Sequence, residues 1–340
     1  MKKRILLLTE KPAHDKLLLT NKIMKEYLKN NEYETYNTMM ISTYSFKYPE
    51  NIQYKDYPKT NNIIFNKDLK YKNEYYIENY KKTTKDFFSS FDELILSPDP
   101  DHTGVYSAII TLEETLGENW QKYFKKIIYL NLFNYQQDLL SEQLKNVLFL
   151  EDKGKRLLEN KNKFKFFYEQ GKIKRYFEYN YNINSNIFFK EILKSLNIKY
   201  EKTLTKYIIM TINYIYKEME ETFSESELLT KMSNYKGSGK YKNSNRIFCK
   251  GIGGVASRVT IIDILKNLSF LEKDKNNKNI LKKTKFGNNF YHKLHKKTFD
   301  VDLTYRLNNW MELPFEEAKD KIDKYLIDIF KKQKRKNRYL

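Results

Sequence analysis

Short apolar runs alternate with amphipathic stretches over roughly the first 150 residues. Arg4–Thr9 is a run of leucine and β-branched residues that predicts a buried strand, and Asp15–Leu28 follows it with helical spacing. Phe91–Leu96 and Ile127–Leu130 predict two more strands, with a helix from Gly104 to about Leu116 between them. Strands that alternate with helices are typical of a mostly parallel sheet with helices on both faces. We therefore expect an α/β domain over residues 1–150.

The pattern beyond residue 150 is mainly helical. Residues 151–222 predict a helical and extended connector, in which Tyr176–Ser185 alternates like an extended segment. Ser224 stands three residues ahead of Glu227, as in a capping box, and predicts a helix start. Ser257–Leu268 predicts a helix that is followed by a short strand, a polar turn and a second strand, an order typical of a winged-helix module. We expect residues 223–340 to form one helical, winged-helix-like domain.

Two segments stand apart from this periodicity. Tyr48–Lys85 is polar, rich in tyrosine and weakly periodic, which predicts an insertion or irregular loop. Lys331–Leu340 is a basic tail after an amphipathic helix that begins at Pro314.

Composition and charge narrow the function classes. The chain has 340 residues, and its 63 Lys and Arg against 43 Asp and Glu give a net charge of +20, which indicates a polyanionic partner and favours nucleic acid. The apolar runs are too short for a membrane span, and Ile5–Leu8 is too short for the core of a signal peptide. Cys249 is the single cysteine, so an intramolecular disulfide and a cysteine zinc cluster are excluded. We expect a cytoplasmic, nucleoid-associated protein; its oligomeric state stays open.

Three carboxylates are expected at one edge of the predicted sheet. Glu10 ends the first strand, and Asp99 and Asp101 follow the second. Parallel strands bring their carboxyl ends to the same edge, where such folds bind ligands. Carboxylates with retained waters are what Mg²⁺ prefers, so the pattern predicts a Mg²⁺ site able to position phosphate oxygens. His14 and His102 flank this cluster in the sequence.

The two acidic segments resemble the Toprim domain of type IA topoisomerases, bacterial primases and related nucleases. Leu6–Pro12 is similar to the glutamate-bearing first strand of a topoisomerase, and Leu94–Gly104 is similar to its Asp-x-Asp strand end. The resemblance implies that Glu10 takes the place of the family's acid/base glutamate and that the neighbouring Lys11 binds DNA. It also implies that Asp99 and Asp101 hold metal.

Three later segments resemble the topoisomerase III class, in the order that the family uses. Gly251–Ile262 is similar to the glycine segment that opens a DNA-binding helix, Phe223–Lys231 to the segment before it, and Asp302–Trp310 to the closing helix. The resemblance implies that Arg258 and Arg306 contact single-stranded DNA. Independently, the basic loop between Lys236 and Lys240 is a candidate for contact with the DNA backbone. Tyrosine and phenylalanine interleaved with lysine over 172–189 serve either to stack bases or to pack a core.

The departures from the family define the expected function. The family's Arg-Glu-Gly-Glu after Asp-x-Asp is replaced by His102–Val105, which removes two acidic positions, and Val255 stands at the proline of the glycine segment. The motif around the nucleophilic tyrosine is missing, and only about 90 residues separate the two matched blocks. We therefore expect a reduced type IA topoisomerase-like protein that binds single-stranded DNA with Mg²⁺ and lacks autonomous strand passage. The alternatives are a non-catalytic DNA-binding accessory protein and a metal-dependent Toprim nuclease.

Overall fold

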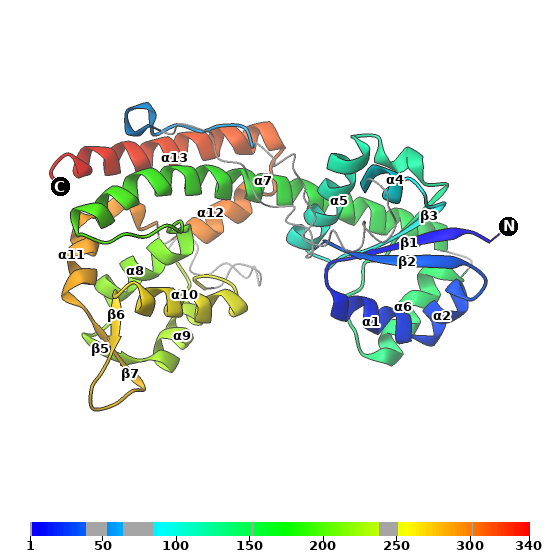
Figure 1. The fold of residues 1–340 in the computed structure, drawn as a ribbon, viewed down its shortest axis with the longest axis horizontal. Coiled ribbons are helices and arrows are strands. Elements are labelled where there is room, and N and C mark those ends of the chain that lie inside the picture. The colour runs from blue at the N-terminus through cyan, green and yellow to red at the C-terminus, as the bar shows by residue number, and fades with distance from the viewer. Residues whose placement is uncertain (1, 39–52, 64–83, 151–152, 238–250, 301) are drawn as a thin grey trace. The chain divides into compact units, whose positions relative to one another are not determined.

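The computed structural model describes residues 2–38, 53–63, 84–150, 153–237, 251–300 and 302–340 (Figure 1). The chain divides into two compact units, of which unit 1 comprises Met1–Lys47 and Ile64–Lys172 and unit 2 comprises Tyr48–Ile63 and Ile173–Leu340. The division falls inside the long helix α7 (Lys153–Ser195), so the stretch 151–222 is shared between the units. Lys240, Cys249 and most of the expected insertion at Tyr48–Lys85 lie outside the described residues.

Unit 1 contains a sheet of four parallel strands. The strands are β2 (Glu32–Asn37), β1 (Arg4–Thr9), β3 (Glu93–Ser97) and β4 (Lys126–Tyr129), in that spatial order. Thr9 lies opposite Ser97, so β1 and β3 end at the same level. The three strands expected from the sequence are confirmed. Strand β2 was not predicted, because it is an edge strand with exposed polar side chains over its first half.

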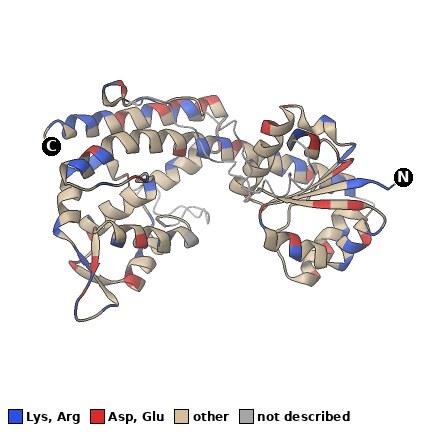
Figure 2. Ribbon diagram, in the orientation of Figure 1, with Lys and Arg blue, Asp and Glu red and all other residues tan. Residues whose placement is uncertain are grey.

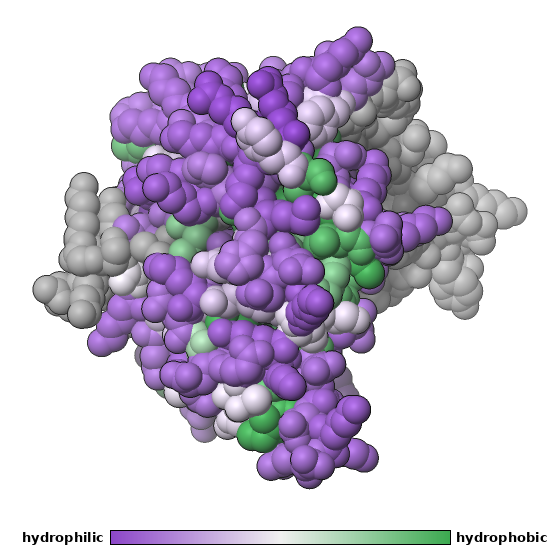
Figure 3. All heavy atoms as spheres, turned by 90° about the vertical axis from the view of Figure 1, so that its left-hand side faces the viewer, coloured by the Kyte–Doolittle hydropathy of each residue, from purple (hydrophilic) through white to green (hydrophobic). Residues whose placement is uncertain are grey.

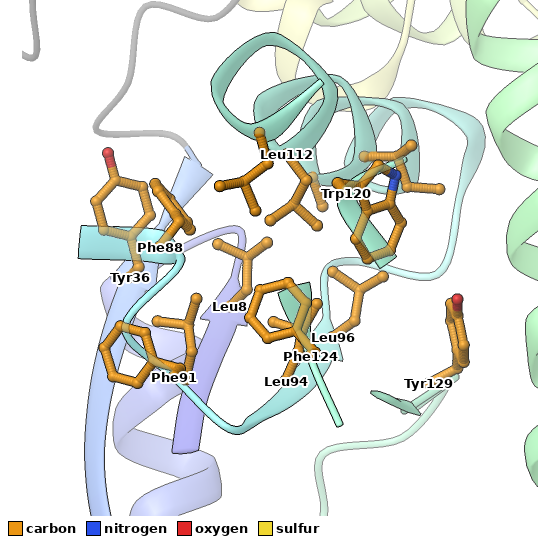
Figure 4. Close-up of a cluster of buried hydrophobic side chains, with 14 of the residues drawn as sticks. Leu8, Tyr36, Phe88, Phe91, Leu94, Leu96, Leu112, Trp120, Phe124 and Tyr129 are labelled. Carbon is orange, nitrogen blue, oxygen red and sulfur yellow. The ribbon is translucent and has the colours of Figure 1, made fainter. Parts of the chain in front are cut away.

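Successive side chains of the central strands enter two different cores, as strand geometry requires. Leu6 and Leu8 pack on one face of the sheet with Leu96 and Trp120, as Figure 4 shows for Leu8, Leu96 and Trp120. Ile5 and Leu7 pack on the other face. Figure 1 shows these faces covered by helices on both sides, which confirms the expected layered α/β arrangement. The covering helices are α1 (Pro12–Thr20), α2 (Lys22–Leu28) and α6 (Gln137–Leu148) on the second face, and α4 (Thr84–Phe88), α5 (His102–Leu116) and the 3₁₀ turn Trp120–Tyr123 on the first.

Unit 2 is mainly helical and contains a small antiparallel sheet. The order of this sheet is β5 (Thr222–Ser224), β7 (Ile280–Lys283) and β6 (Leu271–Lys273). The hairpin of β6 and β7 follows α10, as the helix, strand, turn and strand order predicted. The helices besides the second half of α7 are α8 (Lys206–Glu218), α9 (Glu225–Asn234), α10 (Val255–Asn267), α11 (Lys285–Lys293), α12 (Leu303–Trp310) and α13 (Phe315–Asn337), with 3₁₀ turns at Tyr54–Asp56 and Lys296–Thr298.

The extended segment predicted at Tyr176–Ser185 is wrong, because these residues are helical within α7. Most of their side chains are buried, among them the adjacent pair Tyr176 and Phe177. A helix that is buried around most of its circumference has no polar stripe, so its sequence does not reveal the helical period. Asn180 and Asn184 are accommodated inside it because each donates a hydrogen bond to the carbonyl four residues earlier, at 3.0 and 2.8 Å.

The basic C-terminal segment is part of a docked helix rather than a separate tail. Helix α13 continues to Asn337, whose side-chain amide donates to the carbonyl of Phe188 at 2.9 Å. The buried Gln333 donates to the carbonyl of Lys293 at 3.0 Å. Figure 2 shows acidic residues at the start of α13 and basic residues at its end, the distribution that complements the helix dipole. None of the helices in the described ranges combines the length and the apolar character that a membrane span requires.

Candidate functional site

The carboxyl edge of the sheet in unit 1 brings two of the three predicted carboxylates together. Glu10 follows β1 and Asp99 follows β3, and Lys11 lies between them. The Lys11 ammonium donates a hydrogen bond to Asp99 and lies 3.7 Å from Oε1 of Glu10. This contact with Asp99 raises the pKa of Lys11. The edge therefore holds one lysine ammonium between two carboxylates.

Asp101 is used differently from the other two carboxylates. It is the N-cap of α5, and its Oδ1 accepts hydrogen bonds from the backbone N–H groups of Thr103 at 2.6 Å and Gly104 at 2.9 Å. A carboxylate at this position satisfies helix donors that otherwise lack partners and is stabilised by the helix dipole. Asp101 thus fixes the start of α5 against the strand end that carries Asp99.

Gly104 allows the first turn of α5 to approach Glu10. A Cβ at this position would lie 2.4 Å from Oε2 of Glu10 and 2.6 Å from the carbonyl oxygen of Asp99. Any larger residue would push the Glu10 carboxylate away from the helix start. Burial raises the pKa of Glu10, and the negative charge of Asp99 raises it further. A partly buried carboxylate of this kind is a candidate proton donor or acceptor.

His14 and Tyr135 form a second layer behind the carboxylates. The rings meet edge to face with centroids 4.7 Å apart, and Nδ1 of His14 lies 3.8 Å from Oδ1 of Asp99, beyond hydrogen-bond distance. Burial lowers the pKa of His14 to about 4, so the imidazole is neutral at pH 7. Burial raises the pKa of Tyr135, and the charges of Asp99 and Glu10 add to the shift. Sequence reasoning placed His14 near the cluster and missed Tyr135, whose signal is its position just after β4.

Buried polar atoms without partners concentrate at this edge. Such atoms cost free energy in a protein alone, and each one calls for an explanation such as a bound ligand. By contrast, the neighbouring buried Asp15 is satisfied, since Asn37 donates to it at 2.7 Å. Among the described residues, those at or behind the strand ends with an unpartnered buried side-chain atom are Glu10, His14, Thr38, Ser97, Asn131 and Tyr135.

The residues present fit one mode of Mg²⁺ binding and not a cage built by the protein alone. Within the described ranges, no three Asp, Glu, His or Cys side chains gather as a metal-binding group. One carboxylate oxygen of Asp101 accepts the hydrogen bonds of the helix cap, and Lys11 neutralises the charge of Asp99. Mg²⁺ is commonly held by one or two carboxylates together with substrate phosphates, and Glu10 and Asp99 suit that mode.

The predicted DNA-binding residues of unit 2 are placed unequally. Lys236 is exposed, and its carbonyl accepts a hydrogen bond from Tyr305 at 2.9 Å. Arg306 is paired through Nε with Asp300 at 2.8 Å and keeps 43% of its side chain exposed. Both are accessible to a polyanion.

Arg258, which was expected to contact a DNA phosphate, is mostly buried. Only 8% of the residue is exposed, and its guanidinium donates to the carbonyl of Ile252 at 3.3 Å and to Ser233 at 3.2 Å. It fastens the glycine segment, in which Gly251 has a φ of 100°, to the end of α9. Arg258 therefore positions the glycine segment, and its contact with DNA stays a prediction.

The aromatic residues of α7 pack a core. Tyr176, Phe177 and Tyr181 are each at most 3% exposed, and Tyr181 packs on Phe330 of α13 with centroids 5.4 Å apart. Of the two alternatives for this segment, packing is therefore confirmed over base stacking.

No protein-family model and no curated protein matches the sequence.

Proposed function

We propose that this protein binds single-stranded DNA at the carboxyl edge of the sheet in unit 1, with Mg²⁺, as a reduced type IA topoisomerase-like protein without autonomous strand passage. In this proposal unit 1 is a Toprim domain, and the α10, β6 and β7 region of unit 2 is a winged-helix-like module. The observation that carries the proposal is the group of Glu10, Lys11 and Asp99 at an edge rich in buried unpartnered polar atoms. The net charge of +20 supports a polyanionic ligand.

Each group has a separate role in this proposal. Glu10 and Asp99 would hold Mg²⁺, which when bound neutralises charge on phosphate oxygens. Lys11 is placed to move from Asp99 to a DNA phosphate when a cation takes its place. Lys236, Lys240 and Arg306 would contact the backbone.

A non-catalytic accessory protein is the second candidate function. The observation that favours it is the use of Asp101 as a helix cap and of Lys11 as the partner of Asp99, which leaves fewer free acidic groups for chemistry. The nuclease alternative would need Glu10 or His14 to activate a water at the same edge.

The test measures binding of a labelled single-stranded oligonucleotide to the full chain with Mg²⁺ and with EDTA. We expect Mg²⁺ to tighten binding several-fold in the natural sequence and to have no effect in Asp99→Asn/Asp101→Asn. Metal-free binding should stay equal or become tighter, because two negative charges near phosphate are removed. Asparagine can still cap α5, so the double variant should fold. Glu114→Gln, an exposed change in the same helix, is the matched control.

Two readouts separate the candidates. A double variant that keeps its full Mg²⁺ effect would show that the carboxylates do not hold the metal. Free 5′-phosphate ends after incubation would favour the nuclease, and uncut DNA without a covalent adduct would favour the accessory protein. Binding should also weaken with salt, by a slope of about 0.7 per phosphate contact in a plot of log affinity against log salt.

A further inference from the structure

Unit 2 contains a cavity of about 480 Å³ that the proposed function does not use. Its walls come from α8, α11, the 3₁₀ turn after it and the last turns of α13. This volume is within the range of small-molecule sites. The end of unit 2 that carries α11 faces the viewer in Figure 3, where hydrophilic side chains dominate and apolar patches are small and separate.

The charged side chains that line the cavity are basic. Lys217, Lys296 and Lys336 line it, each from a different element, and none of the described residues that line it is acidic. Lys217 is 3.0 Å from Glu218, whereas neither Lys296 nor Lys336 has a carboxylate within 4.0 Å among the described residues. Like charges that share a cavity repel one another, and an anion between them removes that cost.

One of these lysines is held in place by the protein. Nζ of Lys336 donates to the carbonyl of Leu294 at 2.7 Å, and burial lowers the pKa of this lysine. The crowding of positive charge also extends to His295, whose pKa is lowered by burial and by Lys336, Lys332 and Lys296. A cation that is partly desolvated and fixed by one hydrogen bond has two N–H groups left for a ligand.

Aromatic rings supply the rest of the lining. Tyr291 is stacked on Tyr216, with centroids 5.8 Å apart and an interplanar angle of 19°, so one face of its ring is fixed. Phe299 also lines the cavity, and Nζ of Lys217 lies 5.2 Å from the centre of its ring. Rings beside lysines suit a ligand that joins a flat aromatic group to a phosphate.

We propose that this cavity binds a nucleotide, with its phosphate on Lys217, Lys296 and Lys336 and its base against Tyr291 and Phe299. The nucleotide is either free or one unit of a DNA strand, since both carry the same chemistry. This site is separate from the carboxylates of unit 1, so it stands whether or not they bind Mg²⁺.

The test is calorimetric titration of the full chain with thymidine monophosphate and with inorganic phosphate. We expect the nucleotide to bind more tightly than phosphate and its affinity to fall with salt. Lys217→Gln/Lys296→Gln should weaken binding by about tenfold for each lysine charge removed from the phosphate. Lys275→Gln/Lys278→Gln removes the same charge from the exposed turn between β6 and β7 and should change nothing. Thermal unfolding of both double variants checks that they are folded.

The outcomes are distinct. Equal weakening by both double variants, equal affinity for phosphate and nucleotide, or no binding would each overturn the proposal. Displacement of the nucleotide by an oligothymidine without terminal phosphates would support it and identify the ligand as part of a strand; no displacement together with nucleotide binding would identify a free nucleotide. Asp99→Asn/Asp101→Asn should bind the nucleotide normally, so failure of the Mg²⁺ site and failure of this site are told apart.

Discussion

A buried hydroxyl without a partner is a cost that a ligand can remove. The hydroxyl of Tyr135 is in this position. The Tyr135 ring packs edge to face on His14 with centroids 4.7 Å apart, and the charge of Asp99 acts on the Tyr135 hydroxyl. Protein stability alone gives no reason to keep it, because phenylalanine would fill the same space. Sites that bind ligands often retain groups that destabilise the free protein.

Tyr135→Phe should therefore stabilise the free protein and weaken DNA binding. Removal of the unpartnered hydroxyl is expected to raise the free energy of unfolding by about 1 kcal/mol, and the measurement is urea denaturation beside oligonucleotide binding. Tyr27→Phe is the control, since that hydroxyl donates to Glu93 at 3.0 Å and accepts from Lys126 at 2.8 Å. Its loss should destabilise by a similar amount and leave DNA binding unchanged. A destabilised Tyr135→Phe would mean that the hydroxyl has an internal partner.

The position of α5 depends on its packing against α7. Gly171 of α7 lies so close to α5 that a Cβ there would be 2.3 Å from the carbonyl oxygen of His102 and 2.4 Å from Cβ of Tyr106. Because the start of α5 also carries the Asp101 cap and Gly104, this close approach supports the candidate site as well as the core of unit 1.

Gly171→Ala should lower the free energy of unfolding by about 1–3 kcal/mol, as overpacked sites do. Gly154 is the matched control in the same helix, where a Cβ would meet nothing within 4 Å. Gly154→Ala should be neutral or stabilise by up to about 1 kcal/mol, because alanine favours helix more than glycine does. Thermal or urea unfolding of both variants decides the matter, and equal effects at the two positions would contradict the close approach.

A buried ion cluster makes the second half of α7 sensitive to acid. Oε1 of Glu178 lies 3.5 Å from the buried Lys206, and Oε2 accepts a hydrogen bond from Arg175 at 2.9 Å. Burial alone would raise the pKa of Glu178, but the charges of Lys206, Lys174 and Arg175 outweigh it and lower this pKa to about 2. The folded state therefore holds the Glu178 proton more weakly than the unfolded state does.

This shift predicts a loss of stability in acid. The contribution of Glu178 is complete above its ordinary pKa of 4.5 and is lost as pH falls toward about 2. Glu178→Gln should cost about 3–5 kcal/mol at pH 7, because it leaves the buried Lys206 without its partner, and should flatten the decline between these pH values. Adding Lys206→Met should restore part of the loss. Urea unfolding across pH tests this, and an unchanged decline in Glu178→Gln would contradict it.

The sequence correctly predicted the strands whose residues are nearly all apolar and buried. Strands β1, β3 and β4 are short apolar runs covered on both faces, and their parallel pairing explains why Glu10 and Asp99 meet. It failed where tertiary context decides. The second half of α7 is buried around most of its circumference, and β2 is a polar edge strand. The inward direction of Arg258 depends on the fold of the glycine segment, which no local pattern encodes.

Strand passage needs more than the DNA binding that we propose for the edge of the sheet in unit 1. It needs a tyrosine that forms a covalent phosphotyrosyl intermediate and a protein gate that opens. In the proposed type IA topoisomerase-like protein, about 90 residues separate the two segments that carry the resemblance, too few for both a tyrosine domain and a gate. The tyrosine found behind the carboxylates, Tyr135, has a buried hydroxyl. Burial and the charges of Asp99 and Glu10 raise its pKa, which disfavours the nucleophilic phenolate.

We therefore expect the purified chain not to relax negatively supercoiled plasmid, with or without Mg²⁺, and to leave no protein attached to DNA after a denaturant quench. The measurement is gel analysis of plasmid topology, with parallel detection of labelled DNA that migrates with the protein. Binding of the same plasmid, followed by gel shift, confirms that the preparation is active. Mg²⁺-dependent relaxation with a phosphotyrosyl adduct would contradict this expectation. Tyr135→Phe would then show whether Tyr135 or a tyrosine elsewhere is the nucleophile, since only loss of the adduct in this variant assigns it to Tyr135.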